Sequence, residues 1–256
     1  MTQGWIQAIG LPPRVIAGQT TRHPPTAFSH GGLIKSPGPF DGFNLALHVG
    51  DDPALVHQQR MQLLQALQPF GAHRLAWLEQ THTTIAHRVG AQPCFFPANA
   101  DAVVTDQAGV ACMVMTADCL PIVLSDATGQ EVACIHAGWR GLLNGVIENT
   151  VAEMQSPPVF AWLGAAISQT AFEVGAEVFD LFVGHDDEAS QAFIVASSGK
   201  YMADIYQLAR LRLKKLGVEQ VTGGEYCTYG QDDLFYSYRR QAKTGRMATF
   251  VMIQSA

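Results

Sequence analysis

The sequence predicts an α/β protein of the α+β type with mixed β-sheets, and three observations lead to this fold class. Strand-like apolar runs crowd the middle of the chain, and amphipathic helical patterns flank them on both sides. Strands and helices do not alternate regularly, which argues against a doubly wound parallel sheet. Neither a repeat nor a linker interrupts the 256 residues, and their 48% hydrophobic content is enough for one sizeable core. We therefore expect a single domain over residues 1–256.

The N-terminal part predicts loops followed by one clear helix. Residues 1–50 are rich in Gly, Pro and His, and within them we expect only short strands at 14–18 and 27–29. From Pro53 to Leu67 apolar residues recur at helical spacing, with acidic residues before them and a glycine after them. This pattern predicts an amphipathic helix.

The central and C-terminal parts predict strands and further helices. Apolar runs bounded by turn residues predict strands at 75–78, 83–87, 102–105, 111–115, 121–124 and 131–136. Helical spacing then continues over 142–154. The remaining expected elements are a strand at 159–167, a turn and helix within 170–183, a helix over 200–217 that ends at a glycine, and a buried strand within 244–254.

Composition excludes several classes of function. The formal net charge is -6 and basic residues are scattered apart from the Arg239–Arg240 pair, so a nucleic acid polymer is not an expected partner. The N-terminus lacks signal-peptide features, and no apolar run approaches the roughly 20 residues that span a bilayer. The five cysteines are irregularly spaced and odd in number, so we expect reduced thiols and no disulfide framework. We expect a soluble, cytoplasmic protein without a membrane partner.

Three residues far apart in the sequence suggest a metal site. Cys119 and His136 lie on two strands joined by a turn, so strand ends can place them side by side, whereas His82 must be brought in by tertiary folding. A thiolate and two neutral imidazoles suit zinc, and three protein ligands leave one position open, as in catalytic sites. None of the usual short zinc spacings connects them. Asp118 is a further catalytic candidate that could orient a ligand or transfer a proton.

An anion site is predicted where the strand at 131–136 passes into the next helix. Gly138 and Gly141 let the backbone approach a ligand closely, and the helix start offers unpaired N–H groups. Arg140 adds a positive charge beside them. A phosphate or a carboxylate could bind there.

Several motifs resemble those of one known family. EQTHTT, ADAVVTD, TADCLPIVLSD and HAGWRGLLNGV follow one another along the chain, and CTYGQDDLFYSYRRQAKTGRMA lies near its end. This set closely resembles the laccase-domain family, whose members were first called multicopper polyphenol oxidases and are now assigned as purine nucleoside phosphorylases. The match runs from about the SHGG loop to the C-terminus. It implies a single-domain α/β/β/α sandwich that carries zinc on His82, Cys119 and His136.

The resemblance also implies an enzyme and its substrates. The family is associated with phosphorolysis of adenosine, inosine and methylthioadenosine and with deamination of adenosine, so we expect a purine nucleoside and phosphate as small-molecule partners. Phosphate needs fixed positive charge, which arginine can offer in bidentate form. The phosphate-binding candidates are Arg140, Arg60, Arg239, Arg240 and Arg246.

Two segments depart from the family pattern. Ser29-His30-Gly31-Gly32 stands where the family usually shows Thr-Arg before Gly-Gly, so His30 is a substrate or phosphate candidate in place of a permanently charged side chain. The segment 164–168 reads Gly-Ala-Ala-Ile-Ser in place of a more typical Gly-Pro-x-Ile-Gly. We expect these changes to affect substrate preference or phosphate affinity, because the metal triad itself is intact.

Three alternatives use the same residues. A multicopper oxidase needs His-x-His pairs, and the sequence contains none, so copper is expected only as an adventitious occupant. A cysteine hydrolase of a small amide or peptide would use Cys119 as nucleophile and His136 or His82 as base, which a tightly bound zinc would argue against. An interaction module would have a structural metal, but such sites normally close with four ligands. The sequence leaves the oligomeric state open.

Overall fold

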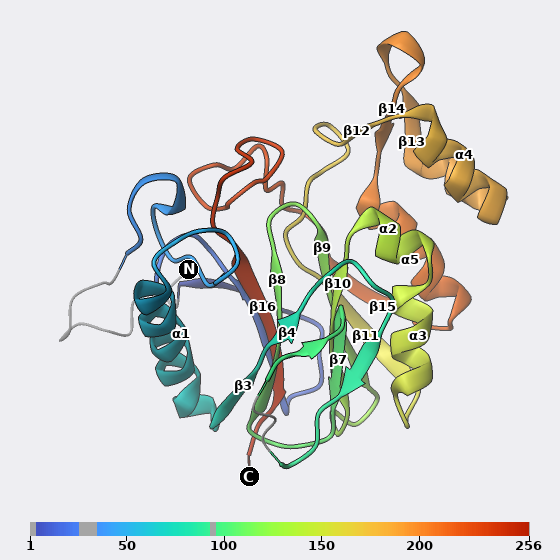
Figure 1. Cartoon of the computed structure of the whole chain (residues 1–256). Coiled ribbons are helices and arrows are strands. Elements are labelled where there is room, and N and C mark those ends of the chain that lie inside the picture. The colour runs from blue at the N-terminus through green and yellow to red at the C-terminus, as the bar shows by residue number, and fades with distance from the viewer. Residues whose placement is uncertain (1–3, 26–34, 93–95, 256) are drawn as a thin grey trace.

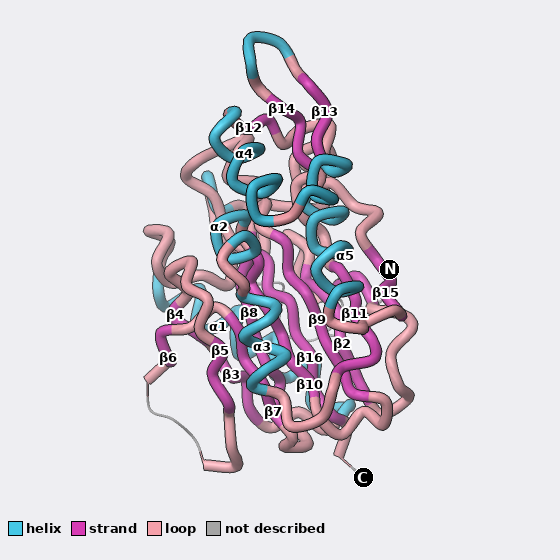
Figure 2. Tube along the Cα trace, turned by 90° about the vertical axis from the view of Figure 1, so that its right-hand side faces the viewer, coloured by secondary structure: helices cyan, strands magenta, loops and turns pink. Residues whose placement is uncertain are grey.

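Two stacked β-sheets form the centre of the molecule, with helices on both outer faces (Figures 1 and 2). The structure, a computed structural model, describes residues 4–25, 35–92 and 96–255. In the view of Figure 1, helix α1 lies on the left of the sheets, and α2, α3 and α5 lie on the right. The strand expected at 27–29 lies outside the described residues.

The first sheet has five strands and is antiparallel except at one edge. Its order is β1 (Trp5–Gln7), β2 (Val15–Thr20), β16 (Met247–Ile253), β8 (Val110–Thr116) and β3 (Arg74–Ala76). Only the β3–β8 pairing within it is parallel. The C-terminal strand β16 is therefore central, as its unbroken apolar run predicts.

The second sheet has six strands, with antiparallel pairing in the centre and parallel pairing at both edges. Its order is β15 (Gln220–Gly223), β11 (Pro158–Leu163), β9 (Leu120–Asp126), β10 (Val132–Ala137), β7 (Ala102–Thr105) and β5 (Ala86–Arg88). The two sheets are thus mixed, as predicted.

Alternation along the central strands explains the layers. In β10, Val132 and Cys134 face the core between the sheets, whereas Ala133 and Ile135 face the core under the helices of the second sheet. In β8 and β16 one set of residues also faces the space between the sheets, and the alternate set packs towards α1. Because successive side chains point to opposite faces, strands buried on both sides read as continuous apolar runs. Three cores stacked in this way confirm the α/β/β/α sandwich.

The helices that cover the sheets begin at local signals in the sequence. Helix α1 (Pro53–Leu67) has the predicted bounds, and the Asp52 side chain accepts a hydrogen bond from the Ala54 N–H at its start. The second sheet is covered by α2 (Trp139–Leu143), α3 (Val146–Glu153) and α5 (Ile205–Lys215). Asp204 caps α5 in the same manner through the N–H of Gln207.

A smaller lobe projects beyond the second sheet at the upper right of Figure 1. It contains α4 (Ala176–His185) and a three-stranded sheet in the order β12 (Glu173–Val174), β14 (Tyr201–Ala203) and β13 (Phe193–Val195). A two-stranded pairing of β4 (Leu78–Glu79) with β6 (Ala98–Asn99) completes the strands of the described residues. Short 3-10 helices cover Gly38–Phe40, Gln68–Phe70, Asp187–Ala192 and Ser197–Gly199.

Four sequence predictions need correction. The helix expected over 142–154 is two helices, because Gly145 adopts a left-handed backbone conformation with φ 95° between α2 and α3. The helix expected over 200–217 begins only at Ile205, since the residues before Asp204 pair as β14. The strand expected at 75–78 is divided between β3 and β4, and the strand expected at 83–87 is reduced to β5.

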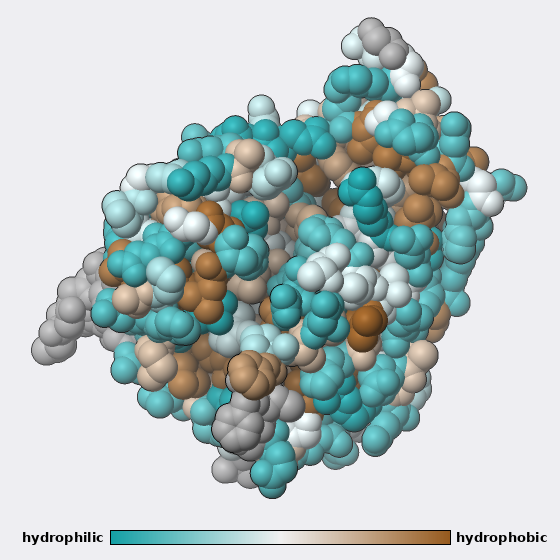
Figure 3. All heavy atoms as spheres, viewed as in Figure 1, coloured by the Kyte–Doolittle hydropathy of each residue, from teal (hydrophilic) through white to brown (hydrophobic). Residues whose placement is uncertain are grey.

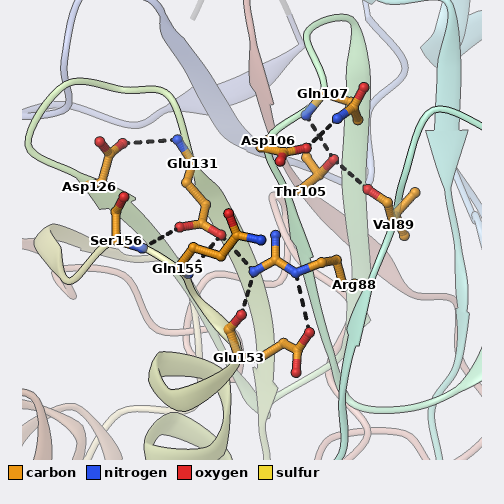
Figure 4. Close-up of polar contacts among 10 residues, drawn as sticks. All are labelled: Arg88, Val89, Thr105, Asp106, Gln107, Asp126, Glu131, Glu153, Gln155 and Ser156. Carbon is orange, nitrogen blue, oxygen red and sulfur yellow. Dashed lines mark hydrogen bonds and ion pairs between the residues drawn. The ribbon is translucent and has the colours of Figure 1, made fainter.

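A polar cluster closes the second sheet at the start of β10 (Figure 4). The Arg88 guanidinium lies 2.7 Å from the buried carboxylate of Glu131, which also accepts hydrogen bonds from the N–H groups of Gln155 and Ser156. Arg88 further contacts Glu153 at the end of α3. These bonds attach α3 to the sheet at the start of β10. His136 lies near the other end of the same strand.

Among the described residues, no helix combines the length and the apolar character needed to cross a membrane. Cys112 and Cys134 are buried in the core between the sheets, where a thiol packs like a small hydrophobic side chain.

Candidate metal centre

The structure brings the three predicted metal ligands together. His82 lies in the loop between β4 and β5, Cys119 in the turn between β8 and β9, and His136 near the end of β10. Their ligand atoms all lie within 4.8 Å of one another. Cys119 Sγ is 4.0 Å from His82 Nε2, and the two imidazole rings meet edge to face at 4.9 Å between centroids. The structure therefore confirms that these three residues form a group that could hold a metal ion.

Strand register explains the approach of two of the ligands. In the antiparallel pairing of β9 with β10, His136 is opposite Pro121 and Ala137 is opposite Leu120. Cys119 therefore lies at the end of the hairpin beside Gly138. The expected side-by-side placement of Cys119 and His136 at strand ends follows directly from this register.

The third ligand depends on a buried carboxylate that the sequence analysis missed. Asp101 is fully buried, and its Oδ1 lies 2.7 Å from Nδ1 of His136. Its Oδ2 accepts hydrogen bonds from the N–H and hydroxyl of Thr83 and from the N–H of Thr81, on either side of His82. His82 itself has a left-handed φ of 61°. One carboxylate thus orients one ligand ring and the loop that carries another, as is usual around metal-binding histidines.

The space between the ligands is kept open by Gly138. A Cβ atom at this position would lie 3.1 Å from Cys119 Sγ and 3.0 Å from Cδ2 of His82. The chain therefore has one thiolate and two imidazoles around a space that the side chain of a larger residue at position 138 would enter. Soft sulfur and borderline nitrogen ligands in this number fit a zinc ion with an open position.

The ligands also polarise one another. Burial would raise the pKa of the Cys119 thiol, but the His136 and His82 imidazoles beside it lower this pKa to about 6. Burial would lower the pKa of His136, but the Cys119 thiolate and the Asp101 carboxylate raise it to about 9. The metal-free site therefore favours a thiolate facing an imidazolium. A metal ion would have to displace that proton, so metal and proton compete for His136.

The Asp118 carboxylate accepts hydrogen bonds from the C-terminal loop. Oδ1 accepts a 2.6 Å hydrogen bond from the Thr228 hydroxyl. Oδ2 accepts bonds from the Ser237 hydroxyl and from the N–H of Arg239. Asp118 has a left-handed φ of 90°, which turns the chain sharply before Cys119. The arrangement favours a positioning role for Asp118, which the sequence left undecided between ligand orientation and proton transfer.

The triad opens into a pocket of about 560 Å³, a size that suits a small organic ligand. In the view of Figure 1, the β8–β9 turn and the loop before β16 lie at the upper end of the sheets, where the pocket is formed. Figure 3 shows the surface hollowed between the loops on the left and the lobe of α4. The lining residues are His48, Gln80, His82, Met115, Thr116, Ala117, Asp118, Cys119, His136, Gly138, Trp139, Arg140, Ile167, Phe172, Tyr238, Arg239 and Arg246.

Only some of the predicted anion-binding residues line this pocket. Arg140, Arg239 and Arg246 do, whereas Arg60 and Arg240 lie outside the lining. The Arg240 guanidinium donates to the backbone carbonyls of Thr228, Tyr229 and Phe235, so it braces the C-terminal loop. His30 lies outside the described residues.

The helix expected to provide the anion site is divided at Gly145 into α2 and α3. Helix α2 has only five residues and no side-chain cap, so it offers one short turn in place of a long helix. The Arg140 side chain is exposed and its guanidinium lies 4.2 Å from the centre of the Trp139 ring. Arg140 is therefore a residue of the pocket rim.

The sequence analysis also missed the aromatic and imidazole side chains of the pocket. His48 was one of nine histidines in the chain and stands in an irregular loop, so no pattern distinguished it. Trp139 lies within the HAGWRG motif, and Tyr238 lies within the C-terminal motif, which could have indicated them. Asp101 stands in ADAVVTD at the start of β7, where an acidic residue before a buried strand was a usable signal.

Solved structures share this architecture. The protein NMB0706 of Neisseria meningitidis superposes with a TM-score of 0.88 at 44% sequence identity, covering 99% of this chain and 100% of that chain. YlmD of Geobacillus stearothermophilus gives a TM-score of 0.87 at 31% identity, covering 100% of this chain and 98% of the other.

Sequence comparison agrees with the structural likeness. The chain is 47% identical over 221 residues to a Shigella flexneri protein named purine nucleoside phosphorylase YfiH, covering 84% of this chain and 88% of the relative. It is 46% identical over 246 residues to the Pseudomonas aeruginosa protein named purine nucleoside phosphorylase PA4543, covering 95% of each. A family model described as multi-copper polyphenol oxidoreductase laccase matches residues 26–254. The chain therefore belongs to the multi-copper polyphenol oxidoreductase laccase family, as its motifs suggested.

Proposed function

We propose that this protein is a cytoplasmic, zinc-dependent purine nucleoside phosphorylase acting on adenosine, inosine and methylthioadenosine, with adenosine deaminase side activity. The observation that carries the proposal is the three-ligand metal group at the wall of a pocket that also contains aromatic and cationic side chains. Relatives at 46–47% identity are named purine nucleoside phosphorylase, which supports the choice of reaction.

The pocket offers surfaces for both substrates. Trp139, Phe172 and Ile167 provide apolar walls against which a purine and a ribose can pack, and the lining arginines provide positive charge for phosphate. In phosphorolysis, an oxygen of phosphate forms a bond to C1′ of the ribose. The bond from C1′ to the purine nitrogen breaks with its electron pair moving to the base, which takes up a proton. The products are a free base and ribose 1-phosphate.

His82, Cys119 and His136 are the residues that would hold the zinc ion. Bound there, zinc supplies a Lewis acid with an open position, which is the chemistry that deamination of adenosine by water requires. Asp101 keeps Nδ1 of His136 engaged, so that Nε2 is the nitrogen left to face the thiolate of Cys119. Copper would be an adventitious occupant of the same ligands.

A second candidate is favoured by the state of Cys119. Its lowered pKa and the nearby imidazoles are what a cysteine hydrolase of a small amide or peptide would need. Zinc and a free nucleophile are mutually exclusive at this sulfur, so metal content separates the two candidates.

The test is chromatography of purine products after incubation of zinc-loaded protein with adenosine or inosine, with and without phosphate. Phosphate-dependent release of adenine and hypoxanthine is expected, with some inosine formed from adenosine. Cys119→Ala should abolish zinc binding, measured by elemental analysis, and turnover, while its circular dichroism stays that of the wild type. Cys227→Ser is the matched control, since Cys227 does not line the pocket. Inosine without free base would leave only a deaminase, and a fully active Cys119→Ala protein would refute the site.

A further inference from the structure

Arg246 is a half-buried cation that lines the pocket. In the part of the chain that the structure describes, no carboxylate forms an ion pair with it. Its Nη1 donates to the carbonyls of Thr244 and Gly245, at 2.8 and 3.0 Å, which fixes the side chain within its own loop. Burial lowers the pKa of Arg246, and the nearby Cys119 and Asp118 partly oppose this effect. Arg246 thus lines the same pocket as the three metal ligands.

His48 lines the same pocket as Arg246, and both Arg246 and Arg60 act on it electrostatically. Burial lowers the pKa of His48, and the positive charges of Arg246 and Arg60 lower it further, which favours the neutral imidazole. Arg60 does not line the pocket, but its Nη2 contacts Sδ of the lining residue Met115. Its Nε donates to the Leu45 carbonyl, and its guanidinium is 4.0 Å from the centre of the Trp77 ring. Burial lowers its pKa to about 10.

The charge of Arg246 is only partly compensated, because the nearby Asp118 carboxylate already accepts hydrogen bonds from Thr228, Ser237 and the Arg239 N–H. Partly buried charges are normally paired, so a half-buried arginine without an ion pair is unfavourable unless an anion joins it. The chain carries a formal net charge of -6, so acidic residues are plentiful, yet none of the described ones forms an ion pair with Arg246 or Arg60. A pocket position with incompletely compensated charge of this kind is typical of a ligand site.

The rim arginines lie in a different environment. Arg140 and Arg239 are exposed; Arg140 stacks on Trp139, and Arg239 donates to the carbonyl of Glu173. Water and salt screen charges in such positions, so they attract anions but hold them weakly. Arg246 is better placed to fix an anion beside the metal triad.

We propose that Arg246 and His48 form the subsite for the phosphate dianion, with Arg60 as a positioning residue outside the pocket lining. This inference rests on the proposed function for the role of phosphate as co-substrate. It moves the phosphate from Arg140 at the rim to the side of the pocket formed by the loops before α1 and β16. The guanidinium offers its remaining N–H groups to phosphate oxygens, and the imidazole donates one more hydrogen bond.

The binding test is calorimetric titration of inorganic phosphate into the zinc-loaded full chain. Arg246→Gln should weaken phosphate binding by about tenfold or more, because a charged hydrogen bond is lost. The phosphate affinity of Arg246→Lys should lie between those of the wild type and Arg246→Gln. Lysine keeps the positive charge but loses the forked pair of N–H donors. His48→Asn should have a smaller effect. Arg14→Gln is the matched control, because Arg14 is exposed and does not line the pocket. Circular dichroism checks that each variant is folded.

Kinetics and a nucleotide titration separate the remaining outcomes. With inosine as substrate, Arg246→Gln should raise the KM for phosphate by a similar factor and leave the KM for inosine nearly unchanged. Unchanged phosphate binding in Arg246→Gln, with loss of binding in Arg140→Gln, would overturn the subsite while leaving phosphorolysis intact. Phosphate binding that depends on Arg246 in a protein that cleaves no nucleoside would retain the subsite and refute the proposed function. Arg246-dependent binding of AMP without binding of inorganic phosphate would also overturn the proposal, because the anion would then arrive on a nucleotide.

Discussion

Nδ1 of His136 lies 2.7 Å from Oδ1 of Asp101, and both side chains are buried at the end of β10. This contact fixes the ring of a metal ligand and determines which of its nitrogens faces the thiolate of Cys119. The other oxygen of Asp101 holds Thr83, next to His82. One carboxylate therefore links the two histidine ligands, although they come from different parts of the sequence.

Asp101→Asn should lower zinc affinity by about 10–100-fold, the usual effect of removing a carboxylate behind a metal-bound histidine. The amide keeps the size of the side chain but cannot accept at both oxygens. Zinc affinity is measured by competition with a chromogenic chelator. Asp106→Asn, on an exposed residue just after β7, is the control and should bind zinc like the wild type. Equal zinc affinity in Asp101→Asn would show that His136 is oriented by its packing alone.

Gly138→Ala should weaken metal binding without harming the fold. The backbone of Gly138, with φ -63°, accepts alanine, but the new Cβ would lie 3.0–3.1 Å from atoms of His82 and Cys119. Overpacking of this kind costs about 1–3 kcal/mol, and about 1.4 kcal/mol is a tenfold change in affinity, so zinc affinity should fall roughly tenfold. The control is Gly184→Ala on α4, where a Cβ meets nothing within 4 Å. That variant should leave zinc binding unchanged, and an equal loss in both would point to a general effect of alanine.

The metal triad and most core strands could be predicted from the sequence, because local patterns determine them. Cys119 and His136 are at the ends of two apolar runs joined by a turn, so hairpin pairing brings them together. His82 was proposed from its residue type, but its spacing gave only a weak signal and the resemblance of its motif strengthened the choice. Asp101 and Arg246 acquire their roles from tertiary contacts, and no spacing in the sequence relates them to the triad. The break at Gly145 was missed because apolar residues on both sides of it keep helical spacing.

Asp126 should make stability depend on pH at the β9–β10 turn (Figure 4). Burial would raise the pKa of this carboxyl, but the Thr128 hydroxyl and three backbone N–H groups outweigh it and hold the pKa below 3.8. The contribution to stability is therefore complete above the unfolded value of 3.8 and is lost as the pH falls through the lower folded value.

Asp126→Asn should lower the free energy of unfolding, measured with urea at pH 7, by about 1–3 kcal/mol, because hydrogen bonds to a charged group are weakened. The difference from wild type should shrink as the pH falls from 5 towards 3 (roughly one unit either side of the unfolded pKa). Asp106→Asn again serves as the control. If the stability difference between wild type and Asp126→Asn stayed constant over this interval, the charge of Asp126 would not be what stabilises the turn.

Zinc should protect Cys119 from alkylation. In the metal-free protein the pKa of about 6 leaves this half-buried thiol largely ionised at pH 7, so iodoacetamide should modify it rapidly. A zinc-bound thiolate no longer attacks, so zinc should slow the reaction by at least about tenfold if binding is tight. Cys227, also half-buried, is the internal reference whose modification should not respond to zinc, and buried Cys112 should stay unmodified in both forms. Peptide mass spectrometry follows the three sites in one sample. Equal modification of Cys119 with and without stoichiometric zinc would remove Cys119 from the ligand set and favour the cysteine hydrolase.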